Sequence, residues 1–236
     1  MSRKRIAVLA SGGGSNLQSL IDHLDDMGDQ RGGDIVLVAS DRSDAGALAR
    51  AQREGITIAT IVSRRAPDGE QIAALLDLHQ VDLLVLAGYL QLVPADVTRA
   101  FAGRLLNVHP GPLPEFGGPG MYGARVHRAV LAAHVPFSGP TVHFVDEQYD
   151  HGATIAHWAV PVRPTDDDHK LAARVLRAEH LLFPRVVQAV AAGRIGLNDA
   201  GRPTAPFFRE DAVVAPMDPS LDDATLARIL DAACAH

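Results

Sequence analysis

The sequence predicts an α/β fold: a Rossmann-like, open and mostly parallel sheet with helices on both faces, extended by antiparallel strands. Short apolar runs typical of buried strands alternate with amphipathic stretches, at spacings that fit right-handed strand–helix–strand crossovers. The first run leads through a glycine-rich turn directly into a helical pattern. The length of 236 residues suits one such domain, or a domain with an appendage.

The elements can be assigned in order along the chain. Apolar runs predict parallel strands at 5–10, 34–40, 56–62, 82–87 and 105–108. Amphipathic patterns between and after these runs predict helices at 17–24, 47–54, 70–79, 94–101 and 124–133. Two further strands, at 138–145 and 153–162, are expected to pair as an antiparallel extension that makes the sheet mixed.

The last third of the chain begins with its longest helical pattern, at 165–193. Thr165 and the three aspartates after it are expected to cap this helix, and Pro184 is expected to kink or split it. From Asn198 onward, prolines and glycines interrupt a polar segment before a short helical pattern at 221–233. The expected division is therefore a main domain, 1–197, and a C-terminal tail, 198–236, packed on it.

Composition and charge narrow the class of partner. A net charge of −6 gives no electrostatic case for nucleic acid or an anionic membrane surface. No apolar run is long enough to span a bilayer, and the basic residues 3–5 lead into a strand pattern rather than a signal-peptide core. The single cysteine, Cys234, excludes an internal disulfide and fits a reducing compartment. A cytoplasmic location is expected.

The turn after the first strand, Ser11–Asn16, contains three consecutive glycines. Glycines let a backbone approach a ligand closely, and a helix N-terminus offers unpaired N–H groups and a positive dipole end. A phosphate is the ligand that this combination favours. The turn lacks the lysine of a P-loop, and Leu17 occupies the place of the third glycine of a dinucleotide fingerprint. Tight packing of the turn is the alternative explanation.

The stretch 104–114, RLLNVHPGPLP, carries the strongest chemical signal in the chain. Its apolar residues predict the end of a buried strand, and its three prolines prevent a regular continuation. Asn107 and His109 are two residues apart, so on a strand they point to the same face. An amide and an imidazole thus emerge together at a strand's carboxyl end, where open α/β sheets bind ligands. An ordinary strand end capped by polar residues is the alternative.

Six motifs, taken together, resemble those of the glycinamide ribonucleotide formyltransferases, folate-dependent enzymes of purine synthesis. The resemblance covers roughly residues 5–197, and the Asn-x-His-Pro motif belongs to the wider formyltransferase superfamily. The motifs are SGGGSNLQ at 11–18, SDRSDAGALARA at 40–51, LVLAGY at 84–89, GRLLNVHP at 103–110, VHFVDEQYDHG at 142–152 and RAEH at 177–180.

The resemblance implies transfer of a formyl group from 10-formyltetrahydrofolate to the amine of 5-phosphoribosylglycinamide, through a tetrahedral intermediate. Asn107 can donate to the oxyanion, an interaction whose loss costs about 10²–10³ in rate. His109 can move protons at neutral pH, which contributes about 10²–10⁴. The resemblance pairs Asp150 with His109, whereas the residues alone favour a turn-forming aspartate before Gly152.

The same match assigns residues to the two substrates. For the ribonucleotide, it implies phosphate contacts at Gly14, Ser15 and Asn16 and a sugar-hydroxyl contact at Glu179. Arg65 falls in register with an arginine that meets the glutamate tail of the folate, and Arg64 is an equal candidate. The remaining folate-site residues implied by the match are Leu90, Gln91, Leu92, Val93, Asn107, His143 and Asp146.

Purely structural roles remain open for several of these residues. Glu179 and the two arginines fit solvated surface charges, and His143 fits a packed strand histidine. No metal site is expected, because the histidines lack a ligand spacing with cysteine or carboxylates and the reaction needs no metal.

The chain also departs from the family pattern. Gln91 replaces an arginine common in the folate site, HPGPLP replaces the usual HPSLLP, and GGPGMYG at 117–123 lengthens the following loop. A hydrolase acting on 10-formyltetrahydrofolate is the alternative enzyme, and a non-catalytic nucleotide-binding module is a further alternative. The expected partners are small molecules, and the sequence does not choose between a monomer and a homodimer.

Overall fold

The computed structural model describes residues 2–62, 68–212 and 214–235. Its strands are β1 Lys4–Leu9, β2 Gly33–Ser40, β3 Thr57–Thr60, β4 Leu83–Leu86, β5 Leu105–His109, β6 Phe137–Ser138, β7 Thr141–Phe144, β8 Thr154–His157 and β9 Val160–Pro161. Seven of them form one sheet in the order β3-β2-β1-β4-β5-β7-β8, and β6 pairs separately with β9. Neighbours from β3 to β5 are parallel, whereas β7 and β8 run antiparallel. The predicted mixed sheet is confirmed.

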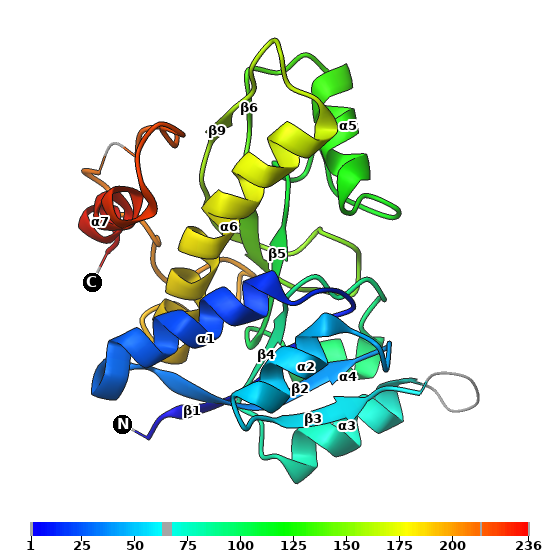
Figure 1. Ribbon diagram of the computed structural model, residues 1–236. Helices are drawn as coiled ribbons and strands as arrows, with labels where there is room; N and C mark the ends of the chain where they lie inside the picture. Colours follow the sequence, from blue (N-terminus) through cyan, green and yellow to red (C-terminus); the bar gives the residue numbers. More distant parts are fainter. Residues whose placement is uncertain (1, 63–67, 213, 236) are drawn as a thin grey trace.

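Helices cover both faces of this sheet (Figure 1). Their bounds are α1 Ser15–Met27, α2 Gly46–Arg53, α3 Asp68–Leu78, α4 Ala95–Ala100, α5 Ala124–Ala132, α6 Asp168–Ala191 and α7 Asp223–Ala233, with a 3-10 turn at Gly28–Gln30. The central strand shows how the faces divide. Ile6 and Val8 of β1 join the core under α1, α2, α5 and α6, while Ala7 and Leu9 join the core under α3 and α4.

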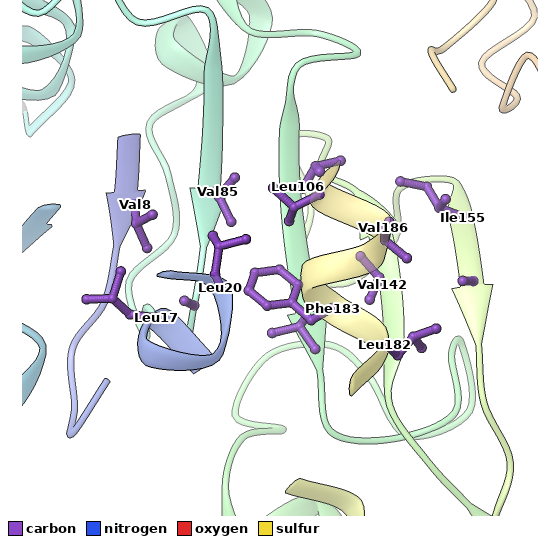
Figure 2. Close-up of a cluster of buried hydrophobic side chains, with 14 of the residues drawn as sticks. Val8, Leu17, Leu20, Val85, Leu106, Val142, Ile155, Leu182, Phe183 and Val186 are labelled. Atoms are coloured by element: carbon purple, nitrogen blue, oxygen red, sulfur yellow. The ribbon is translucent and has the colours of Figure 1, made fainter. Parts of the chain in front are cut away.

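The larger core lies where α1 and α6 cross the sheet. Figure 2 shows Leu20 of α1 next to Phe183 of α6, with Leu17 of α1 on the side of β1, over apolar side chains of the central strands. These three side chains are fully buried. At roughly 1.5–3 kcal/mol for each buried side chain of this size, their burial holds both helices against the sheet. The two helices are also joined by a hydrogen bond between Asn16 of α1 and Glu179 of α6.

The two predicted long strands near residue 140 are each broken in two. Pro140 has no N–H for a ladder, and a Cβ on Gly139, whose φ is +129°, would lie 1.9 Å from the Trp158 carbonyl oxygen. The continuous strands expected at 138–145 and 153–162 are therefore wrong, and the segments before and after the break join different sheets. The antiparallel extension itself, β7 with β8, is present.

The long helix is capped by one of the residues expected to cap it. Its N-cap is Asp167, the second of the three aspartates after Thr165, since the Asp167 side chain accepts a hydrogen bond from Lys170 N at 2.8 Å. Pro184 does not split the helix, which runs unbroken over 24 residues. The Arg185 guanidinium donates to the Leu181 carbonyl at 2.8 Å, which adds a bond in the turn that the proline disturbs.

The segment after residue 197 is tied to the sheet and to α6. Trp158 Nε1 donates to the Ala215 carbonyl at 3.1 Å, and Met217 N donates to the Ala159 carbonyl at 2.8 Å. Leu226 and Leu230 of α7 belong to the larger core. This segment therefore packs against the main domain, with α7 sharing its apolar core with α6.

The order of the strands places the site. From β1 the chain builds outward through β2 and β3, then returns to add β4 and β5 on the other side. In open parallel sheets, ligands bind at the carboxyl ends of the strands next to such a reversal. Three segments emerge there, namely the glycine turn after β1, the Gly88–Val93 segment after β4, and Pro110 after β5.

Candidate active site

Strand register brings the first two polar side chains together. Asn107 of β5 lies directly opposite His143 of β7 in the antiparallel ladder. His143 Nδ1 lies 2.7 Å from the Phe144 carbonyl, which can only accept, so Nδ1 carries the proton. His143 Nε2 therefore has a free lone pair and accepts from Asn107 Nδ2 at 3.1 Å. This contact turns the donor end of the Asn107 amide toward the shared face of the two strands.

His109, at the end of β5, is held at both ring nitrogens. Nε2 donates to the Phe116 carbonyl at 2.8 Å. In the neutral ring the lone pair then lies on Nδ1, which faces Asp150 Oδ2 at 3.4 Å. The basic atom of the neutral ring is thus the one beside the Asp150 carboxylate.

Asp150 completes the cluster from the loop between β7 and β8. Its φ of +54° places it in the left-handed region, so the residue does form the turn, and the turn aims its side chain inward. Asn107 Nδ2 donates to Oδ1 at 3.4 Å, and Gly118 N donates to Oδ2 at 3.0 Å. Burial alone would raise the pKa of Asp150, but the adjacent His109 and His143 rings and the hydrogen bond from Gly118 N hold this pKa well below its usual range.

The cluster opens into a cavity of about 570 Å³. Asn107, His109 and Asp150 line this cavity, and so do Asn16 and Glu179. The cavity therefore joins the catalytic candidates to the end of the glycine turn. This volume is within the usual range for pockets that bury small ligands.

The glycine turn has a fixed backbone. Gly14 has a φ of +75°, and a Cβ at this position would lie 2.6 Å from Ala47 Cα. Only glycine fits there, so close packing and phosphate binding are compatible rather than exclusive explanations of the turn. Asn16, which follows in the first turn of α1, is 9% exposed and lines the cavity.

Glu179 reaches the same point from α6. Asn16 Nδ2 donates to Glu179 Oε2 at 2.6 Å, across 163 positions of sequence. Burial raises the pKa of Glu179 to about 7, against the opposing effect of the Asn16 hydrogen bond. A solvated helix-face charge, the bland alternative, is excluded because the residue is only 7% exposed.

The predicted folate-site residues divide into three groups. Those on the cavity wall are Leu90, Gln91, Leu92, Val93, Asn107 and His143. Asp146 is not part of the described wall, and its carboxylate instead accepts from His151 Nδ1 at 2.6 Å and Gln148 N at 2.8 Å. Arg64 and Arg65 lie outside the described residues. Gln91 Nε2 donates to Asp41 Oδ2 at 3.3 Å.

Two residues of the site were not singled out from the sequence. His127 of α5 is 4% exposed and lines the cavity; burial lowers its pKa to about 4, so its ring is neutral at neutral pH. Its only sequence signal is its place beside Val126 and Val130 on the buried side of the helix. Arg50 donates to the carbonyl of Gly13 in the glycine turn at 2.8 Å. It lies within one of the six motifs, but contacts of this kind have no sequence signature.

Comparison with known proteins agrees with this geometry. A family model described as formyl transferase matches residues 4–187. The chain belongs to the formyl transferase family.

The chloroplastic phosphoribosylglycinamide formyltransferase of Arabidopsis thaliana is 41% identical over 206 residues, which cover 85% of this chain and 70% of that protein. The corresponding protein of Vigna unguiculata is 42% identical over 205 residues, covering 85% of this chain and 65% of its own length. The crystal structure of phosphoribosylglycinamide formyltransferase from Anaplasma phagocytophilum superposes with a TM-score of 0.78 at 31% identity, covering 90% of this chain and 98% of that one. The fold and the family expected from the motifs are thereby confirmed.

Two features of the described residues concern metal ions and membranes. Within the part of the chain that the structure describes, no group of three histidine, cysteine, aspartate or glutamate side chains is placed to hold a metal ion. No helix among the described residues combines the length and apolar character that crossing a membrane requires.

Proposed function

We propose that this member of the formyl transferase family transfers the formyl group of 10-formyltetrahydrofolate to the amine of 5-phosphoribosylglycinamide. One observation carries the proposal: Asn107 and His109 both lie beside Asp150 on the wall of a cavity that Asn16 and Glu179 also line. The two plant relatives are named phosphoribosylglycinamide formyltransferases. The single Cys234 fits action in a reducing compartment such as the cytoplasm.

The cluster suits each step of this reaction. The substrate amine attacks the formyl carbon, and the carbonyl oxygen becomes an oxyanion that Asn107 Nδ2 can stabilise as a donor. The amine must then lose a proton, which the lone pair on His109 Nδ1 can accept, with Asp150 stabilising the charged ring. When the carbon–nitrogen bond to the folate breaks, the same proton can pass to the leaving nitrogen, which returns the ring to its neutral form.

Two parts of the site suit the two substrates. The Leu90–Val93 segment offers an apolar wall, with Leu90 and Leu92 about half exposed, which fits a flat heteroaromatic ring. At the start of α1, the N–H groups of Ser15 and Asn16 suit a phosphate, and the Glu179 carboxyl beside Asn16 suits sugar hydroxyls. The tail contact proposed for Arg65 falls outside the described residues.

The decisive experiment is an assay with 10-formyltetrahydrofolate in the presence and absence of phosphoribosylglycinamide. We expect formylated ribonucleotide to appear in step with tetrahydrofolate, and little release of formate without the amine. Formate production independent of the amine would identify the alternative, a hydrolase. Folate-independent binding of the ribonucleotide without any turnover would identify a non-catalytic binding module.

A further inference from the structure

Helix α2 packs directly behind the glycine turn. Ala47 N donates to the Gly12 carbonyl at 3.1 Å, and the Gly14 backbone is so close to Ala47 that a Cβ would overlap it. A Cβ on Gly46 would likewise lie 3.1 Å from Gly13 Cα and its carbonyl oxygen. The shape of the turn is therefore set by the adjoining face of α2 as much as by its own glycines.

Arg50 extends this face by one helical turn and adds a charge. Its Nε donates to the Gly13 carbonyl at 2.8 Å, and its Nη1 donates to Gln18 Oε1 on α1 at 3.3 Å. One guanidinium thus ties the turn to the helix that follows it. Among the described residues Arg50 has no carboxylate partner, in contrast to Arg42, which pairs with Asp44.

The neighbouring polar groups point to a ligand that has both a donor and an anionic part. Asn16 is nine-tenths buried, and its Oδ1, an acceptor, has no hydrogen-bond partner within the described part of the chain, so it can accept from a hydroxyl or N–H group of a bound ligand. The positive charge of Arg50 also reaches α6: burial lowers the pKa of His180, and Arg50 lowers it further. An unneutralised guanidinium therefore lies beside the positive end of the α1 dipole.

We propose that Arg50 is the positioning residue of the phosphate end of the cavity. By holding the Gly13 carbonyl toward α2, it keeps the N–H groups at the start of α1 open to a phosphate, and its charge strengthens their attraction for a dianion. The proposal rests on the proposed function, because the phosphate is taken to be that of the ribonucleotide substrate. Arg50 acts through the turn and not on the reacting atoms.

The test compares Arg50→Gln with Arg53→Gln, which removes the same charge from the exposed end of the same helix. We expect Arg50→Gln to raise KM for phosphoribosylglycinamide about tenfold or more, in line with the loss of a charge-assisted hydrogen bond, while KM for the folate stays within about twofold. Binding of ribose 5-phosphate, measured by calorimetry, should weaken by a similar factor. Arg53→Gln should leave all three values within about twofold, and Arg50→Lys should recover part of the loss.

Three outcomes would overturn the proposal: equal effects of the two glutamine variants, equal loss of affinity for both substrates, or unchanged binding of ribose 5-phosphate to Arg50→Gln. The calorimetric arm separates this proposal from the proposed function. Ribose 5-phosphate binding that depends on Arg50, in a protein without transferase activity, would support the phosphate site while refuting the reaction. Transferase activity with unchanged constants in Arg50→Gln would refute only the role of Arg50.

Discussion

The proposed site has two polar ends, the end of β5 and the glycine turn, and they are built differently. At the end of β5 the functional groups are side chains: Asn107 and His109 both contact Asp150, and the backbone of 116–118 holds His109 and Asp150. At the glycine turn the proposed binding surface is backbone, and side chains from α2 and α6 contact it and the start of α1.

This difference predicts how substitutions will divide. Groups at the end of β5 are proposed to face the place where charge develops during the reaction, so changes there should lower kcat. Groups at the glycine turn are proposed to bind the phosphate, which does not change during the reaction, so alterations there should raise KM and leave kcat nearly intact.

The largest effect is expected at the end of β5. His109→Ala removes the proton acceptor and should lower kcat by about 10²–10⁴-fold, and Asn107→Ala removes the oxyanion donor and should lower it by about 10²–10³-fold. Steady-state kinetics should show KM for the ribonucleotide changing much less than kcat. Because the two groups act together, the double variant should lose less than the product of the single losses.

The exposed histidine at position 134 supplies the control for this series. His134→Asn keeps a residue that tolerates its positive φ and should retain full activity. If instead His109→Ala kept kcat within a few fold, proton transfer would have to occur elsewhere in the cavity, and the contrast between the two ends would fail.

The next effect concerns the buried carboxyl that links the two ends. Burial raises the pKa of Glu179 from 4.5 to about 7. Between these values the folded chain holds a proton that the unfolded chain has released, so the contribution of Glu179 to stability falls as pH rises through this window. One proton corresponds to a slope of about 1.4 kcal/mol per pH unit at most.

Chemical denaturation at a series of pH values measures this slope. Glu179→Gln should flatten the fall in unfolding free energy between pH 4.5 and 7, relative to the wild-type chain. Glu54→Gln, a change at an exposed carboxylate, should leave the slope unaltered. Parallel curves for the wild type and Glu179→Gln would mean that the carboxyl titrates like a solvated one.

The parts of the fold and of the site that the sequence predicts are those set by local patterns. Asn107 and His109 share a strand and are two positions apart, so alternation alone placed them on one face at a carboxyl end. The inner parallel strands are recognisable for a similar reason, because burial on both faces leaves continuous apolar runs, whereas the edge strand β3 is largely exposed.

Contacts between distant segments could not be predicted in this way. Asp150 reaches His109 because a single backbone angle lies in the left-handed region, which an aspartate adopts only where the surrounding loop requires it. Arg50 and His127 sit on helices whose patterns fix the buried side but not the neighbouring element. The break after His157 depends on how closely Gly139 approaches Trp158, which no local pattern encodes, whereas Gly139 and Pro140 give a local signal for the break after Ser138.

The smallest effect is expected for a charge placed at the glycine turn. Ser15→Asp puts a carboxylate in the first turn of α1, where a phosphate is proposed to bind. Repulsion should raise KM for phosphoribosylglycinamide by roughly tenfold, with kcat close to that of the wild type.

An acidic residue at a helix N-terminus stabilises the helix by about 0.3–1 kcal/mol, so the Ser15→Asp variant should be at least as stable as the wild type. This separates the effect from unfolding, and Ser15→Asn, which has the same shape without the charge, should bind the ribonucleotide within a few fold of normal. A loss of affinity that is confined to Ser15→Asp and relieved by high salt would locate the phosphate at this turn; equal affinities of the two variants would place it elsewhere in the cavity.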